Sequence, residues 1–350
     1  IHQRVWFSDA AFLVALKLPA VAADLLTGWV IFAWARRVVG RDAVLLASAY
    51  LLNPGVVFVS AYWGQVDAVG ALLAVAGLAA LRPEAPVAGA VLLTAAVLVK
   101  PQVAPALLPA GVYLAHALLR PRQGGRRWDL LLDAAAAALA TGVALLAPFG
   151  LGPRRLRETL QSSLGVYPYG SVMAFNAWGA AAGFWTSDSQ RWLGMPYYAI
   201  GAAATLVVLA LIAVWVWRHP GGRTAVMAAG VALLATFVLP TRIHERYLLY
   251  TVPCFAMAAA LDRRVAGLYA ALSLLLNANL LYAYTRPHLQ TFVLPPWLEA
   301  TVFSGGAVRL WSAFGALALP AALYLLFTWR GSDARLPTPG IAVSPPAGTA

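Results

Sequence analysis

The chain has little charge, a single cysteine and only two lysines in 350 residues. Charged residues make up 11% of the sequence and hydrophobic residues 61%, whereas soluble domains carry about a quarter charged residues. This composition excludes an ordinary soluble domain and indicates an integral membrane protein, in agreement with a mean hydropathy of +0.74. The one cysteine, Cys254, lies in an apolar run, so a disulfide framework is excluded. Ligand spacings typical of zinc sites are also absent from the sequence.

Apolar runs that suit membrane helices recur along the chain. The shorter runs need flanking residues to reach the length of a membrane helix. They lie at about 8–35, 43–60, 66–82, 86–99, 102–119, 130–149, 198–217, 224–240, 247–261, 265–284 and 307–329. The sequence therefore predicts an all-α, polytopic transmembrane helical bundle of about 11 membrane segments over residues 1–330, with an outer loop at 150–197. Residues 331–350 are rich in Pro, Gly and Ser and are predicted to form a disordered cytoplasmic tail.

Arginines in the short loops predict how the bundle is oriented. They follow every second apolar run, as Arg36, Arg37, Arg41, Arg82, Arg120, Arg122, Arg126, Arg127, Arg218, Arg223, Arg263, Arg264, Arg330 and Arg335. Because such loops stay in the cytoplasm, we expect a multi-pass protein of the bacterial cytoplasmic membrane with its C-terminus inside. The net charge of +12 then reflects orientation, not nucleic-acid binding. Ile1 would lie outside without a signal peptide, which predicts a further helix and its loop upstream of it.

The densest group of polar residues is Thr241–Tyr247, which lies between two apolar runs. An unpaired charge at the middle of a membrane costs roughly 2.5–3.5 kcal/mol, so this segment is expected at the membrane surface. There it is suited to hold an anionic group and to move a proton. Three other polar segments map to the same predicted outer face: 53–67, Lys100-Pro101-Gln102, and 167–178 in the outer loop.

The order of these segments resembles that of a known enzyme family. The motifs are NPxxxxxSxYWGQxD (Asn53 to Asp67), KPQ (Lys100 to Gln102), SxxxxNxW (Ser171 to Trp178) and RxHERYL (Arg242 to Leu248). Together they resemble the polytopic GT-C glycosyltransferases, in particular bacterial polyprenyl-phosphate-mannose-dependent mannosyltransferase-like proteins. The resemblance implies a sugar donor on a polyprenyl phosphate, expected to be mannose, and an acceptor that is a glycolipid, glycan or protein. It also implies outer-face loops that form the site, and a catalytic carboxylate in a first outer loop that would precede Ile1.

An inverting transfer needs a base for the acceptor hydroxyl, cations for the leaving phosphate, and walls for the lipid and sugar. We expect neither a cofactor nor a metal, because outer-face acids are few and arginines could neutralise the phosphate. Asp67 is the candidate base unless that group precedes Ile1, and Glu245 is assigned to orient a donor-site cation or to contact the sugar. The expected phosphate-binding residues are Arg242, His244, Arg246 and Lys100. The expected sugar- and acceptor-binding residues are Trp63, Gln65, Gln102, Asn176, Trp178 and Tyr247.

Each of these assignments has a structural alternative. Asp67 is also what the dipole of a helix N-terminus favours, and 244–246 would fit a solvated turn. Lys100 would fit a lysine that extends to the membrane surface. Trp178 and Asn176 would fit an interfacial aromatic and a turn residue.

Two rival functions remain open for the whole chain. One is a flippase or transporter for lipid-linked sugars, which needs polar residues at membrane mid-depth. Lys17 and Asp24, two turns apart in the first apolar run, are consistent with a transporter, although a structural ion pair is the preferred interpretation. The other is a membrane subunit without chemistry. The sequence does not identify the sugar, acceptor or linkage.

Overall fold

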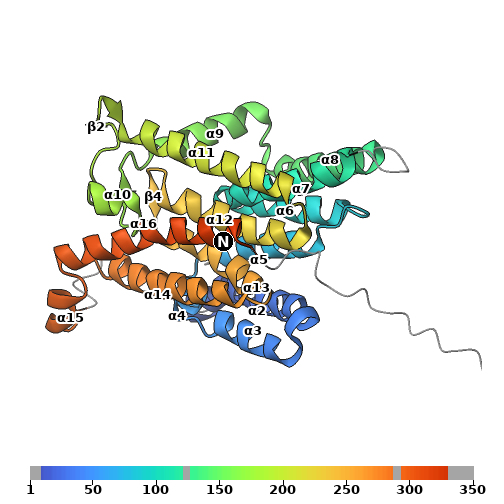
Figure 1. Cartoon of the computed structure of the whole chain (residues 1–350). Coiled ribbons are helices and arrows are strands. Elements are labelled where there is room, and N and C mark those ends of the chain that lie inside the picture. The colour runs from blue at the N-terminus through green and yellow to red at the C-terminus, as the bar shows by residue number, and fades with distance from the viewer. Residues whose placement is uncertain (1–8, 121–126, 287–292, 330–350) are drawn as a thin grey trace, which may run out of the picture.

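The computed structural model describes residues 9–120, 127–286 and 293–329, which form a helical bundle (Figure 1). Its first half contains α2 (Asp9–Val39), η1 (Gly40–Asp42), α3 (Ala43–Leu51), α4 (Pro54–Val57), η2 (Phe58–Trp63), α5 (Asp67–Ala80), α6 (Val87–Val99), η3 (Pro101–Ala106), α7 (Leu107–Leu119), α8 (Trp128–Leu146), η4 (Ala147–Phe149) and α9 (Pro153–Gly165). The second half contains β1 (Ser171–Val172), α10 (Ala177–Ala181), β2 (Arg191–Trp192), β3 (Met195–Pro196), α11 (Tyr197–Arg218), α12 (Gly222–Val238), β4 (Ile243–His244), η5 (Glu245–Tyr250), α13 (Thr251–Ala259), α14 (Arg263–Thr285), α15 (Pro296–Thr301) and α16 (Gly305–Phe327).

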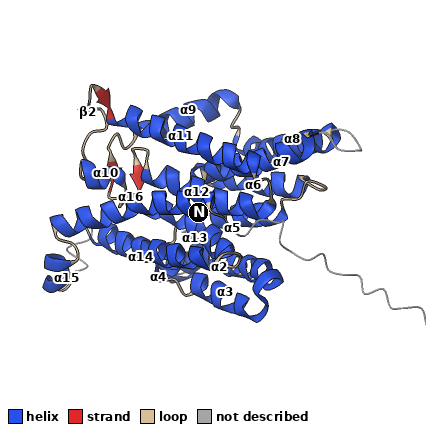
Figure 2. Ribbon diagram, viewed as in Figure 1, coloured by secondary structure: helices blue, strands red, loops and turns tan. Residues whose placement is uncertain are grey.

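The structure is almost entirely helical, as Figure 2 shows, and the predicted all-α membrane architecture is confirmed at that level. Six helical segments among the described residues are long and apolar enough to cross a membrane. They are Asp9–Leu51, Pro101–Leu119, Trp128–Phe149, Tyr197–Arg218, Arg263–Thr285 and Gly305–Phe327. The other apolar helices are shorter, so the expected count of about 11 segments stays a prediction. The expected tail at 331–350 lies outside the described residues.

Helices α12 and α13 form the centre of the bundle. Every residue of α13 is buried, and so is every residue of α12 from Thr224 to Val238 except Thr236. A helix that is apolar on all sides needs neighbours on all sides, and small residues let those neighbours approach closely. Outer helices behave differently: on α8, Leu132 and Leu139 are exposed, as expected for side chains that face lipid.

Helix ends that lie next to arginine-bearing segments contact one another in two places. The Arg264 guanidinium donates 2.7 Å to the backbone oxygen of Thr328, which joins the start of α14 to the end of α16. Ala35, Ala43 and Ala260 pack against one another where α2, α3 and the end of α13 meet. This grouping is the one expected from the arginine pattern, and which side of the membrane it faces remains a prediction.

The preferred interpretation of Lys17 and Asp24 as an ion pair is wrong. The Lys17 ammonium donates 2.7 Å to the backbone oxygen of Tyr62. Asp24 accepts hydrogen bonds from the Tyr50 hydroxyl, at 2.8 Å, and from the Ser60 hydroxyl. Two turns of helix separate the charges by about 10 Å along the axis, whereas α3 and η2 bring hydroxyl groups directly to the carboxylate.

Gly315 of α16 packs against the backbone of the segment before α10, and its replacement is a first test of the fold. A methyl group there would overlap the carbonyl oxygen of Phe175. That backbone cannot retreat easily, because Asn279 accepts from the Phe175 amide at 2.9 Å and donates to the Met173 oxygen at 2.6 Å. We expect Gly315→Ala to lower the free energy of unfolding by about 1–3 kcal/mol, measured by unfolding in detergent.

The matched control is Gly111→Ala in α7, where an added methyl group meets no atom within 4 Å. Alanine favours a helix over glycine by about 0.5–1 kcal/mol, so this variant should be as stable as the wild type or slightly more so. Equal stability of the two variants would contradict the packing described here.

Candidate functional site

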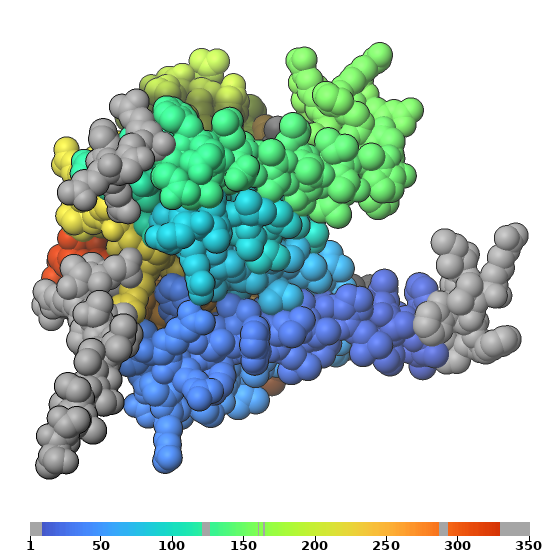
Figure 3. Space-filling view, turned by 90° about the vertical axis from the view of Figure 1, so that its right-hand side faces the viewer, coloured from blue at the N-terminus to red at the C-terminus, as the bar shows by residue number. Residues whose placement is uncertain are grey.

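Four segments far apart in sequence meet at one end of the bundle. They are the start of α5, the junction of α6 with η3, the β4–η5 segment, and the loop before α10. β1 pairs with β4 in parallel, with Val172 opposite His244, and this pairing connects the loop to the η5 segment. On the space-filling surface, α9 and the start of α2 project on the same side with a hollow between them (Figure 3).

Local sequence explains how the first two segments end where they do. η2 stops at Gly64, which has a φ of 79°, a left-handed conformation that glycine adopts without steric cost. The chain then turns and begins α5 at Asp67, an acidic residue that the helix dipole favours in the first turn. Lys100 has extended backbone before Pro101 and so ends α6.

Asp67 is the residue on which the contacts of the site converge. It is 0% exposed, and its Oδ1 accepts a hydrogen bond from the Tyr250 hydroxyl. Its Oδ2 lies 3.4 Å from Lys100 Nζ and 3.8 Å from Arg246 Nε. A buried carboxylate needs such partners, because desolvation otherwise disfavours its charge. The geometry therefore makes Asp67 the residue that holds two cations at the end of the bundle.

Arg246 connects this carboxylate to the rest of the site. Its guanidinium donates a hydrogen bond of 3.1 Å to Glu245 Oε1. The guanidinium carbon also lies 5.6 Å from the ring centre of Trp63 and 5.5 Å from the ring centre of Tyr247. Both distances are within the range of cation–π attraction. Its side chain is 20% exposed, so this cation can still be reached from outside.

His244 and Glu245 form the next layer. His244 Nδ1 lies 3.8 Å from Glu245 Oε2, and the imidazole packs edge-to-face on Tyr167 with ring centres 4.8 Å apart. Burial alone would raise the pKa of Glu245, but the nearby His244 imidazole and the charge of Arg246 outweigh it and lower that pKa below the ordinary 4.5.

The lowered pKa predicts an acid-sensitive site. Glu245 contributes stability fully above its unfolded-state pKa of 4.5, and that contribution is lost as the pH falls below 4.5 through the folded-state value. The melting temperature of the wild type should therefore decline more steeply below pH 4.5 than that of Glu245→Gln, in detergent and at matched ionic strength. Parallel declines in the two proteins would contradict this account.

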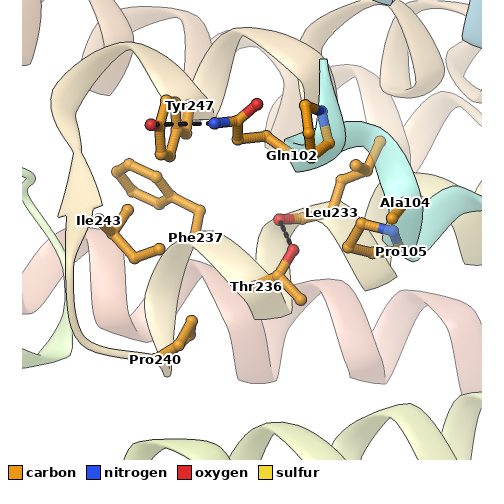
Figure 4. A pocket seen from close by; sticks show the side chains of 10 residues that line it. Gln102, Ala104, Pro105, Leu233, Thr236, Phe237, Pro240, Ile243 and Tyr247 are labelled. Atoms are coloured by element: carbon orange, nitrogen blue, oxygen red, sulfur yellow. Dashed lines mark hydrogen bonds between the residues drawn. The ribbon is translucent and has the colours of Figure 1, made fainter. Parts of the chain in front are cut away.

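Gln102 and Tyr247 border a cavity beside the charged groups (Figure 4). The Gln102 amide donates 3.1 Å to the Tyr247 hydroxyl, and its own oxygen is buried without a hydrogen-bond partner among the described residues. The cavity has a volume of about 300 Å³. Its walls are mainly apolar and include Pro101, Pro105, Leu233, Phe237, Pro240 and Ile243. This cavity suits an apolar chain that ends near the cations.

Arg242 is held differently from the other expected phosphate ligands. Its Nε donates 2.6 Å to Asp188 Oδ2, and the same oxygen accepts from Thr241 at 3.1 Å. Its backbone amide donates 2.8 Å to the Tyr169 oxygen, and its φ is 66°. These contacts tie the outer loop to the β4 segment, so Arg242 positions the neighbours of His244.

Asn176 and Trp178 use their polar atoms within the protein. Asn176 accepts 3.0 Å from the Gly179 amide as the N-cap of α10 and donates 3.3 Å to the Phe237 oxygen. Trp178 Nε1 donates 2.7 Å to the Leu239 oxygen. These bonds give both residues a structural role, because they hold α10 against the end of α12. Gln65 is half-buried in the turn before α5.

Sequence reasoning missed three residues of this region. Tyr250 binds Asp67, Asp188 binds Arg242, and Tyr167 packs on His244. Tyr167 begins the polar segment 167–178 of the outer loop, and Tyr250 lies three residues after Tyr247 on what could be one helical face. Asp188 had no sequence signal beyond its place in the outer loop. Among residues 9–120, 127–286 and 293–329, no group of three or more His, Cys, Asp or Glu side chains is arranged to hold a metal ion.

Comparison with known proteins adds no assignment to this geometry. No model of a known protein family matches the chain, and a search of curated proteins finds no match.

Proposed function

We propose that the chain is a glycosyltransferase that moves a sugar, expected to be mannose, from a polyprenyl-phosphate donor to a glycolipid, glycan or protein acceptor. The reaction would take place on the extracytoplasmic face of the bacterial cytoplasmic membrane. The observation that carries the proposal is the pair of cations, Lys100 and Arg246, held on Asp67 beside an apolar cavity. A lipid-linked phosphate has the same two parts, an anionic head and a long apolar chain.

In this proposal the donor's first isoprenoid units occupy the 300 Å³ cavity, and its phosphate lies toward Arg246 and Lys100. Arginine binds phosphate oxygens through its planar fork, and lysine adds a point charge. Negative charge grows on the phosphate as the bond to the sugar breaks, so cations fixed in advance stabilise the transition state.

The charges of the cluster balance before a donor binds. Lys100 and Arg246 face the two carboxylates of Asp67 and Glu245, which leaves no net positive charge while His244 is neutral. A protonated His244 would supply the extra charge for a bound phosphate and could deliver that proton to the leaving group.

The identity of the base stays a prediction. Both oxygens of Asp67 face partners, and its side chain would have to exchange Tyr250 for the acceptor hydroxyl to act as the base. The geometry supports a positioning role for Asp67 instead.

A lipid-linked sugar flippase is the second candidate, and one observation favours it. The helix that contains α3 breaks at Asn53 before α4, and the Asp24 carboxylate is buried among hydroxyl groups beside this region. Broken helices and buried polar groups at mid-depth are features of transporters. The charged groups of the site nevertheless gather at one end of the bundle, which favours the transferase.

The test uses the purified protein in detergent. Radiolabelled polyprenyl-phosphate mannose and a membrane lipid extract are supplied, and products are separated by chromatography. We expect label to move into a new product in the wild type and not in His244→Ala. A protein that transfers no label from mannose or any other polyprenyl-linked sugar, but moves labelled lipid across proteoliposomes, would be a flippase.

A further inference from the structure

A second cavity lies away from the charged site, between α3, α4 and α14. Its volume is about 340 Å³. On one side it is bordered by Leu45 and Leu52, which are 69% and 76% exposed, and by the exposed Pro54. The cavity therefore opens on the outer surface of the bundle through an apolar rim.

The floor of this cavity is polar. It is formed by Asn53 at the break between α3 and α4, and by Tyr269, Ser273 and Asn277, which recur at helical spacing on α14. No charged side chain lines it among the described residues. Tyr269 and Asn277 lie roughly 9 and 21 Å from the start of α14, at 1.5 Å per residue. In a membrane this floor would face the hydrocarbon region, where polar groups are costly.

Four polar atoms of these lining residues are buried and have no hydrogen-bond partner in the described part of the chain. They are Asn53 Nδ2, the Tyr269 hydroxyl, the Ser273 hydroxyl and Asn277 Oδ1. Tyr269 lies beside Asn53 and Ser273 without a hydrogen bond of good geometry to either. Such clusters are rare, because a buried polar group without a partner loses its bonds to water and gains none in return.

The amide of Asn53 is fixed by its neighbours. Its oxygen accepts 3.0 Å from the Gly55 amide, so its nitrogen must point the other way, as a donor with no partner. Asn53 is 4% exposed. The oxygen of Asn277 lies against Gly55, where an added methyl group would be 2.7 Å from it. Glycine at this position lets the two amides approach the same cavity.

We propose that this cavity binds the hydroxyl-bearing head of a neutral lipid, such as a diacylglycerol or another long-chain alcohol. A hydroxyl group both donates and accepts, which the mixed set of donors and acceptors on the floor requires. Absence of charge on the floor disfavours an anionic headgroup. An open apolar rim disfavours water alone, because water at the rim would face hydrocarbon, whereas a lipid covers the rim with its own chain. The site is independent of the proposed transferase chemistry.

Native mass spectrometry of the full chain tests this proposal with two probes that differ in one group. They are 1,2-dioleoylglycerol, with a free hydroxyl, and its 3-O-methyl ether. We expect the ether to bind roughly three- to tenfold more weakly, the effect of losing about one hydrogen bond. Ser273→Leu, which fills the cavity, should abolish binding of the alcohol. Asn277→Ala should weaken that binding by a similar three- to tenfold, which keeps the test valid if Ser273→Leu does not fold.

The control variant is Ser312→Ala, a buried serine on α16 whose hydroxyl donates to the Val308 oxygen of its own helix. It should bind the alcohol like the wild type. Equal binding of alcohol and ether, or wild-type binding in both cavity variants, would overturn the proposal. So would the absence of any lipid adduct together with hydroxyl-radical labelling of Tyr269, which would show that the cavity holds water.

Discussion

Replacing Arg246 with alanine is expected to reduce sugar transfer by roughly 10²- to 10³-fold, the usual effect of removing one fixed donor from a site of developing charge. Arg246 contacts both carboxylates of the site and both flanking aromatic rings. The protein should still fold, because Lys100 continues to face Asp67 and His244 continues to face Glu245. Initial rates of label transfer, measured over a range of donor concentrations, would report the loss.

Two further variants separate charge from geometry. Arg246→Lys keeps the charge but loses the planar fork that binds phosphate at two points. Its rate of sugar transfer should therefore lie between those of the wild type and Arg246→Ala. Arg154→Ala changes an arginine that is 89% exposed on α9 and should transfer like the wild type. Full activity in Arg246→Ala would remove this residue from the donor site and leave the cavity without its charged end.

The gathering of the polar segments could be predicted from the sequence. The sequence predicts Asp67, Lys100 and Arg246 on one face, because each lies where an apolar run begins or ends and every second end of an up-and-down bundle lies on the same side of the membrane. Contacts at 3.4 and 3.8 Å now join these three residues, and a 3.1 Å bond joins Gln102 to Tyr247. Hydropathy reports helix ends directly, so it can predict that residues at these ends lie on the same side of the bundle.

Individual partners could not be predicted in the same way. Arg242 binds Asp188, and Asn176 caps α10, because the outer loop folds back and pairs with β4. Loop paths of this kind carry no periodic signal. The pairing of Lys17 with Asp24 was wrong for a related reason: sequence spacing along one helix says nothing about which side chains a neighbouring helix presents.

The number of membrane crossings stays a prediction. Several expected segments, such as 66–82 and 86–99, became helices shorter than about 20 residues. The run 43–60 is broken at Asn53, before α4. The run 102–119 instead continues from η3 into α7 as one candidate membrane span, and the break lies before it, at Lys100. Proline and a capping asparagine interrupt helices. A hydropathy average over a window of many residues does not register such single-residue breaks.

Asp67→Asn is expected to lower the free energy of unfolding by about 3–5 kcal/mol, the cost of breaking a buried charge pair by removing one partner. Asparagine has nearly the same shape and can still accept from Tyr250, so packing changes little. What is lost is the negative charge that faces Lys100 and Arg246. Unfolding of the purified protein in mixed micelles, followed by tryptophan fluorescence, would measure the change. Asp133→Asn, at an exposed carboxylate on α8, is the matched control and should unfold like the wild type.

A double variant shows whether charge is the cause. Adding Lys100→Met to Asp67→Asn removes the cation that lost its partner, and Arg246 keeps Glu245 at 3.1 Å. The double variant should therefore be more stable than the sum of the two single changes predicts, by about 0.5–3 kcal/mol. Additive effects would mean that Asp67 and Lys100 are neighbours without energetic coupling. In that case Asp67 would not position the cations, and the proposed donor site would need another anchor for Lys100.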